Sequence, residues 1–112
     1  MRSVVVAVAL LFVAPVAGAA VPKCQAAAWP VIVRATQAGM MVTELGAHET
    51  AEIAAFYNAQ PPVSNAPINR VIVLTGDKLA PNLLVIVARG DCVYDAVKMP
   101  LDTFHKIVGL PI

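Results

Sequence analysis

Two short apolar runs near the middle of the chain limit its fold most tightly. They cover residues 71–75 and 83–88, and Gly, Pro, Asn and charged residues flank them. Both runs are rich in Val, Ile and Leu and too short for a typical helix, so each is predicted to be a β-strand. Neither alternates apolar with polar residues, which is typical of a strand covered on both faces. We therefore expect both runs inside a sheet or against a partner.

A third strand is predicted directly after these two, over residues 92–98, where apolar and polar residues alternate. One face of this strand would carry Val93, Asp95, Val97 and Met99. Gly90 and Asp91 fit a two-residue hairpin loop in which Gly supplies the positive φ of a type II′ turn. The three strands are therefore expected to form an antiparallel meander.

A fourth strand and two helices are predicted around this meander. The strand covers residues 40–45, and a helix then runs to Asn58. The last helix covers residues 100–108, because Pro100 suits a first turn and Gly109 suits the position after a last turn. The expected apolar stripes are Ile53, Phe56 and Tyr57 in the first helix, and Leu101, Phe104 and Val108 in the second.

The segment 25–37 does not decide between helix and strand. Gln25 and the alanines after it favour a helix, whereas Pro30 disfavours helical geometry at Trp29. A helix is the preferred interpretation. Trp29 is the only tryptophan, and we expect it to cover the core near Cys24; the alternative is a role in stacking on a ligand.

The predicted fold class is α+β, with a small antiparallel sheet made of the three-strand meander plus one further strand. Two or three helices are expected to pack on one face of this sheet. Because so few short helices cover only one face well, the continuous apolar strands indicate a partner on the other face.

The first twenty residues have the pattern of a secretory signal peptide. Arg2 precedes an apolar stretch over residues 4–13, and small residues follow as far as Ala20. The stretch is shorter than the ~20 residues that a spanning helix needs, although a retained anchor is the alternative. Cleavage after Ala19 or Ala20 would leave residues 21–112 as a single small α+β domain, periplasmic or secreted, with no membrane span.

The chain contains two cysteines, Cys24 and Cys92. Export would place both in an oxidising compartment, where disulfides persist. We therefore predict an internal disulfide between them, and the alternatives are two free thiols or a bridge between subunits. A bridged cysteine is not available as a nucleophile.

The charge balance bears on the kind of partner. The chain has 8 Lys and Arg against 7 Asp and Glu, so loss of Arg2 leaves equal numbers in residues 21–112. Binding to nucleic acid needs a positive surface, and we expect none here. A chain that is 59% apolar and carries little net charge favours protein contacts or self-association.

Candidate catalytic and metal-binding groups are few. His48 and Glu52 occupy the two histidine positions of the zinc motif His-Glu-x-x-His, so the second ligand is replaced. A stable metal site needs three or four ligands. Ser64 lacks the Gly-x-Ser-x-Gly context of a serine nucleophile. A copper site would use the two histidines with Met40, Met41 and Met99. We predict no catalytic residue, no metal and no cofactor.

The sequence thus predicts an exported small binding or accessory module that acts through protein–protein contacts or a small apolar ligand. Two alternatives stay open. The first is a structural envelope protein that associates with copies of itself. The second is a small hydrolase-like or metal-binding protein that uses His48 or His105 with Glu52 or Asp102. The partner is an unknown protein or a second copy of the chain.

Overall fold

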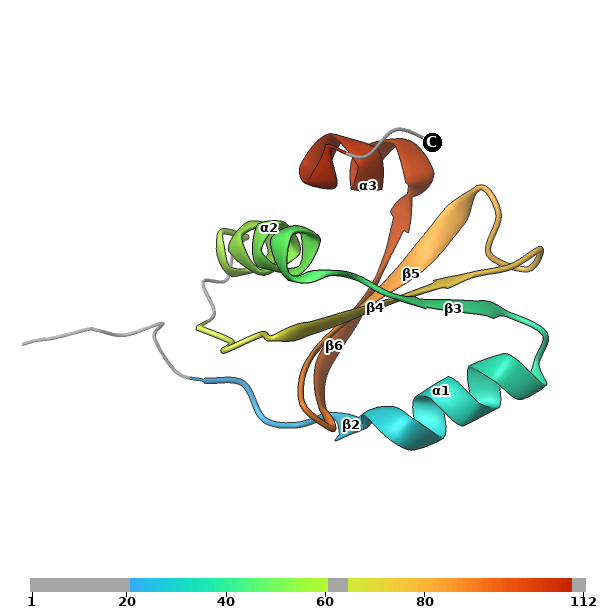
Figure 1. Ribbon diagram of the computed structural model, residues 1–112, viewed down its shortest axis with the longest axis horizontal. Coiled ribbons are helices and arrows are strands. Elements are labelled where there is room, and N and C mark those ends of the chain that lie inside the picture. Colours follow the sequence, from blue (N-terminus) through green and yellow to red (C-terminus); the bar gives the residue numbers. More distant parts are fainter. Residues whose placement is uncertain (1–20, 61–64, 110–112) are drawn as a thin grey trace, which may run out of the picture.

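The computed structural model describes residues 21–60 and 65–109, which form an α+β fold around a five-stranded antiparallel sheet (Figure 1). The strands are β2 (Ala26–Ala27), β3 (Met41–Glu44), β4 (Arg70–Thr75), β5 (Asn82–Arg89) and β6 (Cys92–Pro100). The helices are α1 (Ala28–Gln37), α2 (Ala47–Asn58) and α3 (Leu101–Val108). The predicted α+β class is confirmed, whereas the proposed signal peptide lies outside the described residues.

The strand order is β2-β6-β5-β4-β3, and the meander of β4, β5 and β6 is present as predicted. Gly90, at φ 57°, and Asp91 form the two-residue connection between β5 and β6. The fifth strand, β2, is not predicted from sequence. It contains only two alanines, which pair with Cys92 and Val93, so no alternation marks it.

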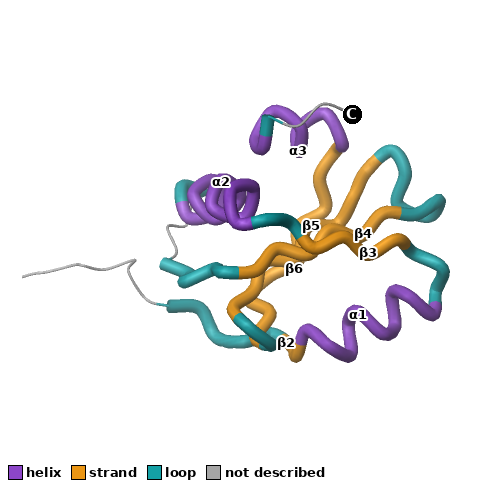
Figure 2. Tube along the Cα trace, in the orientation of Figure 1, coloured by secondary structure: helices purple, strands orange, loops and turns teal. Residues whose placement is uncertain are grey.

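The prediction that the helices pack on one face of the sheet is wrong. Helices α2 and α3 cover one face and α1 covers the other, so the fold has three layers (Figure 2). The α2/α3 face receives Val71, Val73, Leu83, Val85 and Val87. The α1 face receives Ile72, Leu74, Ile86 and Ala88. The continuous apolar runs are therefore explained largely within the chain, because successive side chains enter two different cores.

Helix α1 packs on the sheet through small and branched side chains. Its inward stripe is Ala28, Val31, Ile32 and Ala35, spaced i, i+3, i+4 and i+7. Pro30 lies in the first turn, where a missing N–H costs the helix no bond. Trp29 follows Ala28 and lies off this stripe, so it is 66% exposed. The expectation that Trp29 covers the core is wrong.

The inward stripe of α2 is offset from the predicted one. Thr50 and Ile53 are buried and Tyr57 is half-buried. These three residues are spaced i, i+3 and i+7, so they lie on one side of the helix. Phe56 lies beside this stripe and is 37% exposed, so its predicted burial is wrong. In α3 the prediction is confirmed, since Phe104 and Val108 are buried and Leu101 is half-buried.

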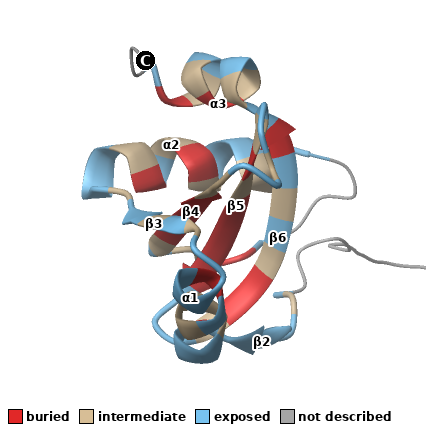
Figure 3. Cartoon of the chain, turned by 90° about the vertical axis from the view of Figure 1, so that its right-hand side faces the viewer, coloured by how far each residue is buried: buried red, intermediate tan, exposed pale blue. Residues whose placement is uncertain are grey.

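A β-bulge in β6 changes which face its first residues occupy. Ala88 pairs with Val93 and Val87 pairs with Asp95, so Tyr94 is the extra residue. Val93 therefore packs on the α1 face, while Val97 and Met99 pack on the α2/α3 face. The predicted common face of Val93 and Val97 is wrong, because strict alternation does not continue through a bulge. Figure 3 shows the buried positions concentrated on β4, β5 and parts of β6.

Candidate functional site

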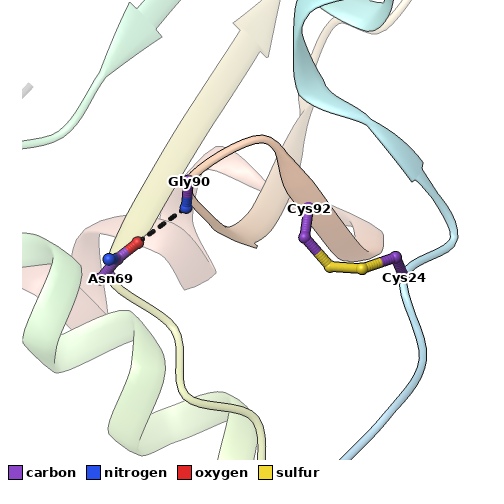
Figure 4. Close-up of a disulfide and its surroundings, with 4 residues drawn as sticks. All are labelled: Cys24, Asn69, Gly90 and Cys92. Carbon is purple, nitrogen blue, oxygen red and sulfur yellow. Dashed lines mark hydrogen bonds between the residues drawn. A yellow bond between two sulfur atoms is a disulfide. The ribbon is translucent and has the colours of Figure 1, made fainter.

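The predicted disulfide joins Cys24, just before β2, to Cys92 at the start of β6 (Figure 4). The two Cα atoms are 5.3 Å apart although the residues are 68 positions apart in sequence. Beside the bridge, the backbone N–H of Gln25 donates to the carbonyl of Val93 at 2.7 Å. Both cysteines are therefore structural, and a disulfide indicates an oxidising compartment.

The β5–β6 turn also holds the beginning of α1. The N–H of Ala28 donates to the carbonyl of Asp91 at 2.8 Å, and the N–H of Trp29 donates to Asp91 Oδ1 at 3.0 Å. These bonds satisfy N–H groups that a helix leaves free at its first turn, and the carboxylate faces the positive end of the helix dipole. The turn is held from its other side by Asn69, whose Oδ1 accepts from the N–H of Gly90 at 3.1 Å (Figure 4).

An apolar groove lies on the α1 face of the sheet, between α1 and the neighbouring strands β5 and β6, and we call it the β5–β6 groove. Its lining is Gln25, Ala26, Val31, Leu84, Ile86, Val93, Asp95 and Ala96. Ile86 and Val93 are buried, while Val31 and Leu84 are half-buried and Ala96 is exposed. The groove has a volume of about 300 Å³. Helix α1 contacts β3 and β2, and its Val31 forms the side of the groove that faces Leu84 and Ile86.

A second hollow, of about 410 Å³, lies at β2 and the disulfide. It is shallower than the groove and is lined by Cys24, Gln25, Ala26, Ala27, Asp91 and Cys92. Gln25 and Ala26 line both hollows, so the two adjoin each other at these residues. The backbone N–H of Trp29 donates to Asp91, which lines the second hollow, and the Trp29 side chain is exposed.

On the outer edge of β6 beside the groove, the side chain of Asp95 occupies a backbone donor of the strand. Its Oδ1 accepts from the N–H of Ala96 at 2.8 Å, and its Oδ2 accepts from the hydroxyl of Tyr57 at 2.9 Å. The N–H of Ala96 is therefore already bonded and cannot serve an added strand. Lys98 and Pro100 follow on the same strand, and such residues protect sheet edges from pairing. The groove can thus receive side chains, while strand addition at β6 is blocked.

The contact between Tyr57 and Asp95 gives a pH dependence. Burial raises the pKa of Tyr57 above its ordinary value of 10.0, and the hydrogen bond and negative charge of Asp95 raise it further. The folded chain therefore holds this proton more tightly than the unfolded chain, so the stabilisation is complete below pH 10 and is lost as the pH rises through the folded pKa.

We expect the free energy of unfolding to decrease as the pH rises above about 10, and to decrease less steeply in Tyr57→Phe. Urea denaturation of both proteins at several pH values, with absorbance titration of the tyrosines, measures this. Equal slopes for the two proteins above that pH would contradict the assignment.

The predicted alternative site residues lie apart from the groove. His48 is on α2 with its side chain 78% exposed, and its Nε2 is 3.6 Å from Glu52 Oε2. His105 is on α3, with its ring centroid 6.0 Å from that of Phe104. Among residues 21–60 and 65–109, no three His, Cys, Asp or Glu side chains are grouped to hold a metal ion. Ser64 lies outside the described residues.

Sequence reasoning missed the groove because no unusual residue type marks it. Leu84 and Ile86 belong to an apolar run that already has a structural explanation, and Ala96 is an ordinary small residue. The one available signal was the surplus of apolar residues in β5, which indicated that something covers a second face. The part of that face that is covered depends on the position of α1, and the sequence pattern does not specify this position.

Comparisons with known proteins assign the chain to no family. No family model, no curated protein and no solved structure matches it. In the described part of the chain, no helix has the length and apolar character needed to cross a membrane. The geometry of the groove is therefore the basis for assigning a function.

Proposed function

We propose that this chain is an exported small binding module, and that its β5–β6 groove receives an apolar side chain of a partner protein. The observation that carries the proposal is the groove itself, an apolar hollow over the buried Ile86 and Val93 whose half-buried Leu84 is partly accessible to a partner. A volume of about 300 Å³ is at the lower end of the range for ligand pockets and suits one large side chain.

The form of the surface favours a protein partner over a small free ligand. The groove shares Gln25 and Ala26 with the hollow over the disulfide. The exposed Trp29 is joined to Asp91 of that hollow through its backbone N–H. Protein interfaces combine a central pocket with flatter surroundings, and tryptophan is enriched among the residues that dominate their binding energy. The blocked edge of β6 indicates that the partner contributes side chains to this surface and not a β-strand.

Export is supported by two independent features. The Cys24–Cys92 bridge suits an oxidising compartment, and the first twenty residues have the pattern of a signal peptide. We place the mature chain in the periplasm or outside the cell. The equal numbers of acidic and basic side chains in residues 21–112 agree with a partner that is held by apolar contacts.

The test is capture of partners from the native envelope by tagged protein comprising residues 21–112, compared with three variants. Ala96→Trp fills the groove from an exposed position, and Trp29→Ala removes the exposed ring. Ala51→Trp is the control, because Ala51 is exposed on α2 at the opposite face. Equal urea midpoints would show that all four proteins fold.

We expect a protein that is captured by the native chain and by Ala51→Trp, and that is lost or reduced on the order of tenfold with Ala96→Trp. Trp29→Ala should weaken the capture of the same protein. Capture that is equal for all four proteins would show that the groove is not the contact surface, and no specific capture by any of them would remove the proposal.

A further inference from the structure

Strand β3 forms the other edge of the sheet, and it lacks the features that close β6. It pairs with β4 without any register shift, and its sequence, Met-Val-Thr-Glu, contains neither Pro nor Lys. In the described part of the chain no segment pairs with its outer side. Met41, Thr43 and Glu44 are exposed, as Figure 3 shows for most of this strand. Such an edge is a template for a further strand.

The direction of the free backbone groups follows from the pairing with β4. The N–H of Leu45 donates to the carbonyl of Val71 at 3.0 Å, so the backbone of Leu45 faces β4. Alternate residues of an antiparallel strand face the same neighbour, so Thr43 also faces β4. The N–H and C=O groups of Val42 and Glu44 therefore point away from the sheet.

We propose that β3 pairs with β3 of a second copy of this chain, antiparallel about a two-fold axis, so that the two sheets become continuous. In the register that we assign, Val42 lies opposite Glu44 of the second copy, and Thr43 lies opposite Thr43 of the second copy. The outward backbone groups then meet in two pairs that exchange about four hydrogen bonds. This self-complementary arrangement is the usual form of a symmetric dimer interface.

The contact that Met41 would gain in the dimer supports the same register. Met41 is 68% exposed, and it shares a face of β3 with Thr43 and Leu45. In the assigned register Met41 lies opposite Leu45 of the second copy, so each exposed methionine gains an apolar neighbour. Moving the register so that Val42 lies opposite itself would place Glu44 opposite Met40. The N–H of Met40 already donates to Ala35 at 3.0 Å, so that register forms fewer bonds.

Charge does not oppose the pairing. The one charged side chain on β3 is Glu44, and Arg70 of the same chain binds both of its oxygens, at 2.6 and 3.1 Å. Two copies therefore bring no unpaired like charges together at this edge. A contact based on four residues per copy is smaller than a standard interface of ~1,600 Å², so we expect a dimer that forms reversibly at high concentration.

Single cysteine variants of residues 21–112 test the register, with oxidised glutathione as the oxidant. Two facing thiols and one oxidised glutathione yield one disulfide between the copies and two reduced glutathione molecules. In Thr43→Cys the two new thiols face each other across the axis, at a Cα separation of about 4.5 Å that a disulfide can span. In Val42→Cys they are offset along the strands, and in Ala51→Cys they lie on the exposed surface of α2.

We expect Thr43→Cys to form the linked dimer on the order of tenfold faster than Ala51→Cys, with peptide mapping showing that Cys24–Cys92 is kept. Equal rates for these two variants would overturn the interface. Linkage that is fastest in Val42→Cys would overturn the register.

Sedimentation of the unlinked protein gives a second test. The native chain should show a dimer that increases with concentration, and Thr43→Lys should remove it because two like charges then face each other. Ala51→Lys should keep the dimer, as should Ala96→Trp, because β6 is separated from β3 by β5 and β4. A native chain that stays monomeric at every concentration overturns the proposal and leaves the function of the groove untouched.

Discussion

Replacing Cys24 and Cys92 together by Ala is expected to lower the free energy of unfolding by about 4 kcal/mol. The bridge closes a loop across a sequence separation of 68 residues, which includes every element before β6. In the chain-entropy account, so long a loop strongly restricts the unfolded chain, and removal of the bridge releases that restriction. Domains of this size have a total stability of only ~5–15 kcal/mol, so the loss would be a large part of it.

Removal of the bridge should also destabilise β2 locally, because the bridge holds β2 against β6. Urea denaturation of residues 21–112 gives the change in stability, and hydrogen exchange at Gln25 and Ala28 shows whether their bonds to β6 and to the turn open first. Reduction of the native bridge should reproduce both effects. A change below about 1 kcal/mol in the double variant would contradict this role of the disulfide.

The second large effect is expected for Phe104→Ala, which should cost about 3–5 kcal/mol of stability. Phe104 is 6% exposed and packs in the core between the sheet and helices α2 and α3. Helix α3 has eight residues, too few to be stable alone, so it depends on this contact and on Val108. Loss of the ring would leave a cavity and loosen the helix.

Phe56→Ala is the matched control, because it makes the same substitution in a helix on the same face. Phe56 is 37% exposed, so we expect its loss to cost roughly 1 kcal/mol. Urea denaturation of both variants measures the difference. If Phe56→Ala cost as much as Phe104→Ala, the inward stripe of α2 through Thr50 and Ile53 would be assigned incorrectly.

The elements that the sequence predicts well are those defined by local signals. Strands β4 and β5 are defined by uninterrupted apolar runs, and the turn between β5 and β6 by Gly90 and Asp91. The end of α3 is defined by Gly109, which has φ 66°. Each signal acts within a few residues, through turn geometry or side-chain periodicity. The pairing of Cys24 with Cys92 follows because no other cysteine is available.

The features that the sequence does not predict depend on contacts between distant elements. The side of the sheet that α1 covers is decided by the fit of Ala28 and Ala35 against β4 and β5, and small residues give only a weak helical pattern. The large ring of Trp29 suggested burial, yet its position beside that stripe leaves it in solvent. The bulge at Tyr94 likewise has no sequence marker, although it decides which residues of β6 reach the groove.

The groove, too, could not be predicted from the sequence, because it depends on contacts between distant elements. Its walls come from β2, α1, β5 and β6, so it exists only when the bridge, the turn and α1 are all in place. Sequence patterns report single elements, and a surface shared by four of them has no pattern of its own. The motif-like residues His48 and Glu52, by contrast, are visible in the sequence. His48 is exposed and Glu52 is half-buried, and among the described residues no third metal-binding side chain is grouped with them.

The most direct test of the groove as a contact surface is photo-crosslinking in the cells that produce the protein. A benzophenone amino acid in place of Ala96 lies at the groove, and the same group in place of Ala51 lies on the exposed surface of α2. We predict a discrete cross-linked product with one partner protein from position 96 and none with that partner from position 51. Absence of a product from position 96, or the same product from both positions, would contradict the proposed function.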